Sequence, residues 1–141
     1  MIQQPQFAGR ADVPANPIVS KTIDVSGRPP TALMIVIRFG NLSPEDIFVL
    51  RDPPRVFVKD EAGRDVRYIG QSEKRRPYTL DDYERVPPRG TTERRANLAS
   101  AYDWRHGTHT YELSISGGYV DPVSRRTWEA PRVKVRVAWT R

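Results

Sequence analysis

The stretch "RVKVRVAWT", residues 132–140, decides the fold class of this chain, because every second residue in it is apolar. The inward series is Val133, Val135, Val137 and Trp139, and the outward series is Arg132, Lys134, Arg136 and Thr140. Successive side chains of a β-strand point to opposite faces of its sheet. The period of two therefore predicts a strand with one face in an apolar core.

Weaker versions of the same alternation recur along the chain, between turns marked by proline and glycine. They predict strands within residues 19–25, 31–39, 41–50, 55–60, 64–70, 91–99 and 109–116. A turn at Gly63 is expected to join 55–60 to 64–70 as a hairpin, and Gly117 and Gly118 are expected to form the turn after 109–116. No long 3.6-residue period is present, although residues 98–104 could form one short helical turn. The sequence predicts an all-β fold, an immunoglobulin-like antiparallel β-sandwich of about seven strands with at most one short helical turn.

The 141 residues predict one folded domain with an arm in front of it. Residues 1–18 are rich in Gln, Pro and Ala and predict a flexible N-terminal arm, and residues 19–141 predict a single β-sandwich domain. We expect no membrane span, because no stretch approaches the ~20 apolar residues that cross a bilayer. We also expect no signal peptide at the N-terminus, which lacks a basic start followed by an apolar run. Two locations stay open: the cytoplasm, or the periplasm or exterior if a signal peptide was removed.

The chain is basic, with a formal net charge of +6 from 23 Lys and Arg against 17 Asp and Glu. The basic residues are spread among acidic ones, and this pattern favours a solvated surface over a nucleic-acid-binding arm. An alternative is a basic sheet face that binds nucleic acid or another anionic polymer, because Arg132, Lys134 and Arg136 share one face of a strand. Whether Arg38 or Arg94 joins that face depends on the strand pairing and stays open.

Both histidines lie in "AYDWRHGTHTYELSIS", residues 101–116. A zinc ion could use the spacing of His106 and His109, but a zinc site needs three or four protein ligands and the chain has no cysteine. We therefore expect no metal, no cofactor and no catalytic residue, with a metal or enzyme site at the two histidines as the alternative. Tyr111, or else Tyr102, is expected to pack its ring inside and to reach a backbone group with its hydroxyl, as at the corner of a β-sandwich.

Residues 71–90, "QSEKRRPYTLDDYERVPPRG", interrupt the alternation with a long polar excursion. A loop of this length in a compact domain is usually functional or disordered, so we expect it to dock on a partner together with the corner at 101–109. The predicted contacts are Tyr78 and Tyr83 as anchors, Arg75 and Arg76 opposite acidic groups, Asp81 and Asp82 as determinants of register, and Trp104 at the corner. The alternative is that the two tyrosines tie the loop to its own sandwich and that Trp104 covers one end of the core.

A series of short motifs follows in a characteristic order: "VRYIG" (66–70), "KRRP" (74–77), "DDY" (81–83), "PPRG" (87–90) and "NLASAYD" (97–103). Together with "TALMIVIRF" (31–39) and Tyr111, the series covers roughly residues 30–116. It resembles the N-terminal, non-catalytic immunoglobulin-like domain of the deuterolysin-like zinc endopeptidases, a family that includes the peptidyl-Lys metallopeptidases.

The resemblance implies an immunoglobulin-like fold and a peptidase as partner, because bacterial members of that family use the domain as a propeptide. The chain departs from the family in four ways: it contains no H-E-x-x-H motif, "PPRG" (87–90) stands in place of the usual Pro-Gly turn, His109 stands where a glycine is expected, and residues 117–141 are not covered. The resulting prediction is a non-catalytic, monomeric protein-binding module, similar to a propeptide or a peptidase inhibitor. The alternative function is binding of nucleic acid or another anionic polymer, with nucleic acid the less expected ligand.

Overall fold

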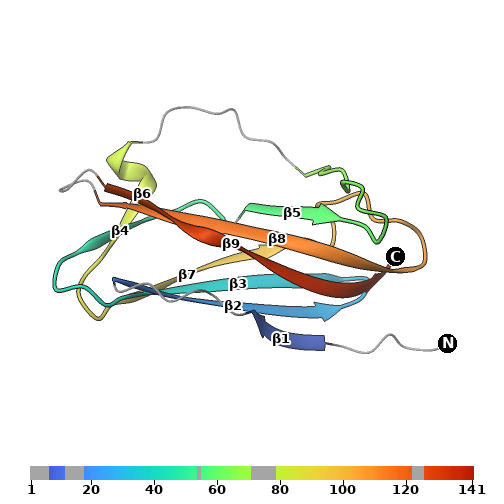
Figure 1. Ribbon diagram of the computed structural model, residues 1–141, viewed down its shortest axis with the longest axis horizontal. Coiled ribbons are helices and arrows are strands. Elements are labelled where there is room, and N and C mark those ends of the chain that lie inside the picture. The colour runs from blue at the N-terminus through green and yellow to red at the C-terminus, as the bar shows by residue number, and fades with distance from the viewer. Residues whose placement is uncertain (1–6, 12–17, 54, 71–78, 122–125) are drawn as a thin grey trace.

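The computed structural model describes residues 7–11, 18–53, 55–70, 79–121 and 126–141 (Figure 1). These residues form two antiparallel sheets and one short 3₁₀ turn, η1 (Leu80–Asp82). The first sheet has the order β1-β2-β3-β7 and contains β1 (Phe7–Ala11), β2 (Val19–Arg28), β3 (Ala32–Asn41) and β7 (Thr91–Asn97). The second contains β4 (Ile47–Leu50), β5 (Arg55–Lys59), β6 (Tyr83–Val86), β8 (Thr108–Asp121) and β9 (Arg126–Thr140). The prediction of an all-β antiparallel sandwich is confirmed.

The long strand β8 organises the second sheet. β9 pairs with it from Thr108 to Asp121, whereas β5 pairs with Glu112–Ser116 and β4 meets it at Tyr119. Since β9 occupies one edge of β8, β4 and β5 follow each other along the opposite edge, and β6 extends the sheet beyond β4. The chain crosses between the sheets after β3, after β6 and after β7, so each sheet contains strands from distant parts of the sequence (Figure 1).

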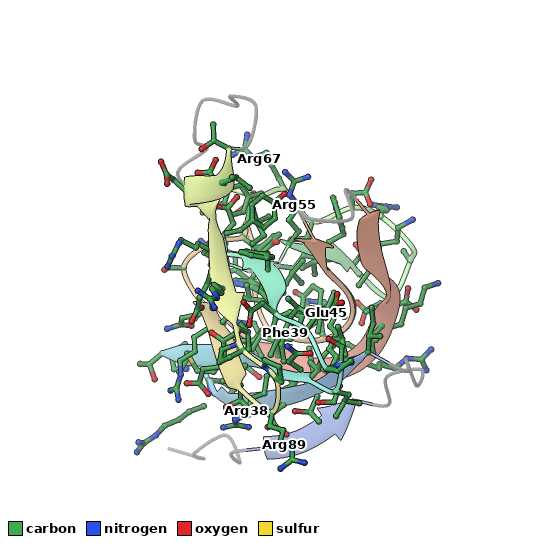
Figure 2. All side chains as sticks on the ribbon, turned by 90° about the vertical axis from the view of Figure 1, so that its left-hand side faces the viewer. Arg38, Phe39, Glu45, Arg55, Arg67 and Arg89 are labelled. Carbon is green, nitrogen blue, oxygen red and sulfur yellow. The ribbon has the colours of Figure 1, made fainter. Side chains whose placement is uncertain are left out.

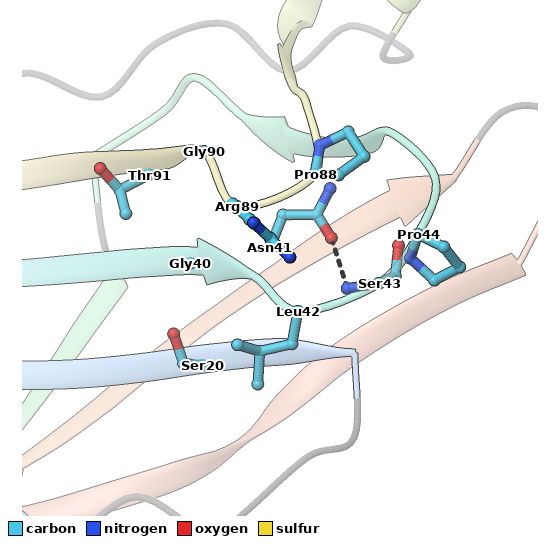
Figure 3. A pocket seen from close by; sticks show the side chains of 10 residues that line it. All are labelled: Ser20, Gly40, Asn41, Leu42, Ser43, Pro44, Pro88, Arg89, Gly90 and Thr91. Atoms are coloured by element: carbon cyan, nitrogen blue, oxygen red, sulfur yellow. Dashed lines mark hydrogen bonds between the residues drawn. The ribbon is translucent and has the colours of Figure 1, made fainter.

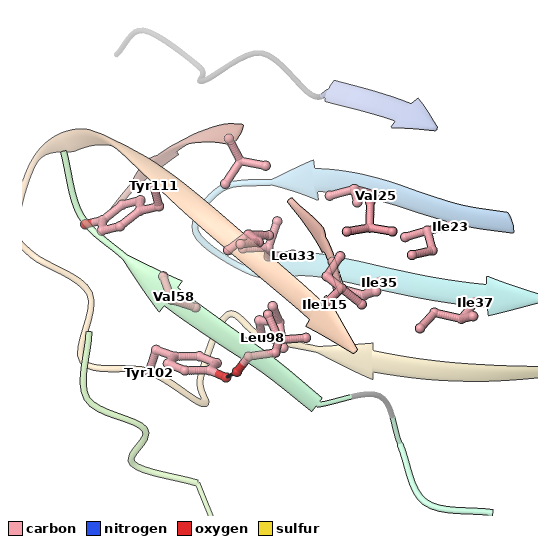
Figure 4. Packing of buried hydrophobic residues seen from close by; sticks show 14 of the residues in the cluster. Ile23, Val25, Leu33, Ile35, Ile37, Val58, Leu98, Tyr102, Tyr111 and Ile115 are labelled. Atoms are coloured by element: carbon pink, nitrogen blue, oxygen red, sulfur yellow. Dashed lines mark hydrogen bonds between the residues drawn. The ribbon is translucent and has the colours of Figure 1, made fainter. Parts of the chain in front are cut away.

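The core lies between the two sheets, where the alternating apolar residues of both meet (Figure 4). Its fully buried members include Ile23 from β2, Leu33, Ile35 and Ile37 from β3, and Tyr111, Leu113 and Ile115 from β8. Burying one such aliphatic side chain contributes about 1.5–3 kcal/mol. From the inward series predicted at 132–140, Val133, Val137 and Trp139 are buried and Val135 is partly buried.

Lys21 interrupts the apolar series of β2, yet its side chain is also buried. Its ammonium group lies 6.0 Å from the centroid of the Phe39 ring, and Phe39 is its register partner on β3. An ammonium group at this distance from an aromatic face is attracted by the ring quadrupole. The aliphatic stem of Lys21 thus fills an inward position that the alternation would assign to an apolar residue.

One correction concerns the N-terminal segment 1–18, predicted as a flexible arm. Residues Phe7–Ala11 within it form β1, which pairs antiparallel with Ile23–Gly27 of β2. The prediction is wrong over these residues, because strand pairing uses backbone groups and needs no alternating apolar pattern. Residues 1–6 and 12–17 lie outside the described part of the chain.

The predicted hairpin of 55–60 with 64–70 forms only at its turn. Gly63 has the expected positive φ of 77°, and the Asp60 N–H donates to the Arg64 carbonyl at 2.9 Å. Beyond the turn, residues 64–70 make isolated bridges, Lys59 with Asp65 and Tyr68 with Tyr102, and no strand. The apolar residues of 64–70 are too few to hold a second pleated strand against the core.

The remaining differences concern a predicted turn, a predicted loop and a predicted helical turn. Gly117 and Gly118 lie inside β8, next to an irregularity between Ile115 and Gly117, and not in a turn. The segment 71–90 contains a strand, β6, as well as loop residues. Residues 98–104 make a single hydrogen-bonded turn, from the Ala101 N–H to the Leu98 carbonyl at 3.1 Å, and no helix.

Arg94 ties the two sheets together from β7. Its side chain is nearly buried, and its Nε donates to the Leu50 carbonyl of β4 at 2.9 Å. A terminal guanidinium nitrogen lies 3.0 Å from Oε1 of Glu84 on β6, which also accepts a 2.6 Å hydrogen bond from the Thr92 hydroxyl. The Thr92 hydroxyl and the guanidinium hold the pKa of the Glu84 carboxyl below its usual range. The nearly buried guanidinium of Arg94 is therefore both ion-paired and hydrogen-bonded within the protein.

Asn41 closes one end of the sandwich. Its buried side-chain nitrogen donates to the Glu45 carbonyl at 2.7 Å and to the Val86 carbonyl at 2.9 Å, and its side-chain oxygen accepts from the Ser43 N–H at 2.9 Å. Its backbone N–H donates to Gly90, and its carbonyl accepts from Arg89. One amide thus joins the end of β3, the loop after it and the end of β6.

Aromatic side chains close the opposite end. Trp104 packs against the rings of Tyr102, Tyr111 and Trp139, with centroids 4.8–6.0 Å apart. The Tyr102 hydroxyl donates to the Val56 carbonyl, and the Tyr111 hydroxyl accepts from the Arg105 N–H at 3.1 Å. Tyr111 and Tyr102 therefore both make the predicted corner contact, in which the ring is buried and the hydroxyl reaches a backbone group.

Removing the Asn41 amide should destabilise the fold strongly. We expect Asn41→Ala to lower the free energy of unfolding by about 2–4 kcal/mol, because buried backbone groups lose their partners. Urea denaturation followed by tryptophan fluorescence measures the change. Ser26→Ala, on the exposed side of β2, serves as control and should stay within about 0.5 kcal/mol of the parent. A similar small loss for Asn41→Ala would show that this amide does not hold the end of the sandwich.

The Tyr102 hydroxyl should make the stability depend on alkaline pH. Burial raises the pKa of Tyr102 from its ordinary 10.0 to about 12. The folded state binds this proton more tightly than the unfolded state, so the stabilisation is complete below pH 10 and is lost as the pH rises toward 12. At pH 8 we expect Tyr102→Phe to cost about 1–2 kcal/mol. The difference between parent and variant in urea denaturation should narrow above pH 10; a difference independent of pH contradicts this account.

Candidate binding face

The outer face of the second sheet gathers basic side chains around one exposed aromatic ring. Alternation directs Val56 and Val58 of β5 into the core, and it directs Arg55, Phe57 and Lys59 outward. On β9 the outward side chains include Lys134 and Arg136, both exposed. We call the group Arg55, Phe57, Lys59, Lys134 and Arg136 the basic face.

The strand register places these residues in rows across β8. Phe57 is opposite Ser114, which is opposite Lys134; Lys59 is opposite Glu112, which is opposite Arg136. Directly opposed residues on one face have Cβ atoms about 4.5–5.5 Å apart, so each row is a continuous strip of surface. Phe57 is 48% exposed although it is a large apolar residue in the middle of a strand.

The described side chains of this face include four cations and two carboxylates, Glu112 and Asp65, of which Asp65 pairs with Lys59 in an isolated β-bridge. The Lys134 ammonium lies 3.7 Å from Oε1 of Glu112, with both side chains exposed to solvent. Exposed pairs of this kind contribute little to stability and leave most of the positive potential in place. The surface therefore attracts anionic groups and presents the exposed Phe57 ring on its β5 side.

The strand pairing shows which arginines share this face. Arg38 lies on the outer side of the first sheet, where it pairs with Asp24 and Glu93, and Arg94 points into the sandwich. Figure 2 shows Arg38 below the first sheet and Arg55 near the top of the same view. Neither Arg38 nor Arg94 joins Lys134 and Arg136. The side chain of Arg132 lies outside the described residues.

The predicted docking loop is described only in part. Arg75, Arg76 and Tyr78 lie outside the described residues. Asp82 is the last residue of η1, where its Oδ2 accepts a hydrogen bond from the Thr79 N–H at 2.7 Å. Asp81 accepts with its backbone carbonyl from Nε of Arg51 at 3.2 Å, and its side chain is exposed.

Tyr83 and Asp82 are both connected to the second sheet. Tyr83 is half-buried, opens β6 and pairs with Leu50 of β4. The Asp82 carbonyl accepts from the Arg51 N–H at 2.8 Å. This part of the loop is thus anchored on its own sandwich, which is the alternative left open for Tyr83.

The structure does not support the prediction that Trp104 contacts a partner. Its side chain is only 2% exposed, and its indole N–H donates to the Leu98 and Ala99 carbonyls at 3.2 and 3.1 Å. The ring fills the aromatic end of the core, so a docking partner cannot touch it while the fold is closed. The alternative, in which Trp104 covers one end of the sandwich, is the arrangement observed.

The two histidines hold the corner at 101–109 together. His109 Nδ1 lies 2.6 Å from Oε1 of Glu61, and its Nε2 lies 2.8 Å from the His106 carbonyl. Hydrogen bonds from the Thr110 N–H and from His109 hold the pKa of the Glu61 carboxyl below its usual range. Among the described residues, no three His, Asp or Glu side chains gather in a group that could hold a metal ion.

An open pocket of about 740 Å³ lies at the Asn41 end of the sandwich (Figure 3). Leu42, Pro44 and Pro88 supply apolar surface, and Arg89, at a left-handed φ of 63°, is its charged residue. The amide of Asn41 is already fully bonded within the fold. The polar centre of this pocket therefore serves the fold, and the basic face remains the better candidate for binding.

Sequence reasoning missed Arg55, Phe57 and Lys59 as site residues. The signal was present in part, because in "RVFVK" (55–59) the spacing of Val56 and Val58 marks the other three positions as outward, although Phe57 is itself apolar. What the sequence lacks is the pairing of β5 and β9 with opposite edges of β8, which brings the two basic strips together.

Within the described part of the chain, no helix has the length and apolar character needed to cross a membrane. No protein-family model matches the chain, and neither does any curated protein sequence. Among solved structures, the chain is similar to the X-ray structure of Northeast Structural Genomics Consortium target SoR45. The TM-score is 0.45 at 12% sequence identity, over 97% of this chain and 84% of that chain. A likeness at this level assigns neither a family nor a function.

Proposed function

We propose that this chain is a non-catalytic binding module that docks on an acidic surface of a partner protein through the basic face. The observation that carries the proposal is the 48% exposure of Phe57, which lies between Arg55 and Lys59 on β5 and across β8 from Lys134. Aromatic and arginine side chains dominate the energetics of protein interfaces, and a charged surround speeds encounter with an oppositely charged partner. The aromatic ring supplies affinity, and the cations select the sign of the partner's charge.

A zinc endopeptidase is the partner class that the sequence resemblance implies. The support is the order of motifs from Val66 to Asp103 and the all-β sandwich that contains them. An immunoglobulin-like identity and a propeptide-like role are parts of this proposal. If a peptidase is captured, its hydrolysis of casein in the presence of equimolar chain measures inhibition directly.

Binding of an anionic polymer is the second candidate, and the same four cations favour it. Single-stranded nucleic acid is usually held by several aromatic rings on which successive bases stack. The basic face offers one described ring, Phe57, and places Glu112 among the cations. These two features favour a protein partner over a nucleic acid.

Capture experiments with matched variants test the docking face. The immobilised chain is incubated with a nuclease-treated extract of the cells that produce it, and bound proteins are quantified by mass spectrometry. We expect Phe57→Ala to weaken binding of the specific partner by at least about 10-fold, as for a central aromatic contact. Leu80→Ala removes an even more exposed apolar residue from η1 and should leave capture unchanged. Loss with Leu80→Ala and retention with Phe57→Ala would move the docking surface to the loop.

A salt titration separates the two candidate partners. Fluorescence anisotropy with a labelled single-stranded DNA should show no binding at about 50 mM salt if the partner is a protein. Binding that falls steeply between about 50 and 200 mM salt indicates the polymer. Arg136→Glu should weaken binding of either anionic ligand, and Arg95→Glu, on the outer side of the first sheet, is the charge-matched control.

A further inference from the structure

The free edge of β9 can be located from the hydrogen bonds at its end. The Gly107 N–H donates to the Arg141 carbonyl at 3.1 Å, and the Arg141 N–H donates to the Gly107 carbonyl at 3.2 Å. In an antiparallel ladder such doubly bonded pairs alternate with pairs that exchange no bonds. The register Thr108–Thr140 through Ile115–Val133 continues from this pair without a shift. The bonded residues of β9 are therefore Trp139, Val137, Val135 and Val133.

The residues between them direct their backbone groups away from β8. Lys134, Arg136, Ala138 and Thr140 thus point their N–H and C=O groups toward the outer edge of the sheet. Their side chains lie on the outer face of the sheet, where Lys134, Arg136 and Ala138 are exposed. Among the described strands, only β8 pairs with β9. β1 of the first sheet comes near β9 but is paired with β2.

The outer edges of β5 and β7 are covered by groups of the chain itself. On β5, the Val58 carbonyl accepts from the Val66 N–H at 2.9 Å, and the Val56 carbonyl accepts from the Tyr102 hydroxyl. On β7, the Glu93 carbonyl accepts from the Arg94 guanidinium at 2.9 Å. An uncovered edge is a template for another strand, and proteins normally blunt such edges. In the described residues, β9 carries charges on this edge but no covering group.

We propose that β9 accepts an extended acidic segment of a partner protein as an additional antiparallel strand. Residues directly opposite each other on one face have close Cβ atoms, so Lys134 and Arg136 favour Glu or Asp in the added strand. The intervening positions of that strand continue the row of Val133, Val135 and Val137, of which Val135 is only partly buried. The favoured segment therefore alternates acidic and apolar residues.

A second copy of the chain fits this edge less well. Pairing of two β9 strands across a two-fold axis would bring the Lys134 and Arg136 side chains of both copies together. Like charges directly opposite each other destabilise a strand pair. Charge complementarity thus selects an acidic segment over self-association.

The inference deepens the proposed function, since it specifies how an acidic partner engages the same sheet, but its test is separate. The probe is an acetylated and amidated heptapeptide of alternating Glu and Val, added to the full-length ¹⁵N-labelled chain. We expect binding to slow amide hydrogen exchange at Arg136, Ala138 and Thr140 by at least 10-fold, because these N–H groups become hydrogen-bonded. The same peptide with Lys in place of Glu is the charge control and should not bind.

Two N-methylated peptides distinguish strand addition from simple charge attraction. In an antiparallel pair, the residues bonded to β9 are those whose side chains share its outer face, which are the Glu residues. We expect N-methylation at Glu to abolish binding and N-methylation at Val to preserve it. Loss with N-methyl-Val alone would indicate a parallel strand and would contradict the antiparallel arrangement. Equal binding of both methylated peptides, or no binding of the parent peptide at 1 mM, overturns the proposal.

A variant of the chain checks the same edge. Ala138→Pro removes an outward N–H but no bond to β8, and proline is tolerated at such edge positions. We expect at least 10-fold weaker peptide binding with a retained β-sheet circular dichroism spectrum. Leu80→Ala, which changes an exposed apolar residue of η1 outside both the basic face and β9, should leave peptide binding unchanged. Failure of the peptide experiments with loss of partner capture in Phe57→Ala would reject strand addition and retain the docking face.

Discussion

The two sheets are held together by one apolar layer, and every other feature depends on that layer staying closed at its ends. Asn41 closes one end by bonding backbone groups of both sheets. Tyr102 and Trp104 close the other end with aromatic surface and with polar tips that reach carbonyls. These polar atoms are hydrogen-bonded within the protein, so they need no water molecules as partners in the core. The outer faces are then free to carry charge.

Much of the fold could be predicted from period-two alternation. The final strand alternates over many residues, and β3 is apolar on both faces, as expected of a central strand; both form as predicted and face a common core. β1 and β6 were missed because they are short and carry mixed residues, so their place is set by the backbone of β2 and β4. The opposite error occurred at 64–70, which meets the edge of β5 at Asp65 and Val66 but has too few apolar residues to form a strand there.

The sequence alone could predict only the two separate parts of the basic face, the outward residues of β5 and those of β9. Alternation marks Lys134 and Arg136 as outward from the sequence alone, and the same rule applied to β5 marks Phe57. That the halves meet depends on β8 lying between them, which is a matter of long-range pairing. The sequence neighbours of Trp104 suggested a role in binding. Its ring is instead buried and packs against Trp139, which lies far along the chain.

The tie made by Arg94 affects the two sides of the sandwich unequally under mutation. Its guanidinium bonds the Leu50 carbonyl, a group that every amino acid carries. Position 50 can therefore exchange side chains without losing the tie. Position 94 has no such freedom, because the planar fork reaches the carbonyl of β4 and Glu84 of β6 at once, and the single ammonium of a lysine cannot reproduce that geometry. Substitutions at position 50 therefore keep this tie, whereas a substitution of Arg94 removes it.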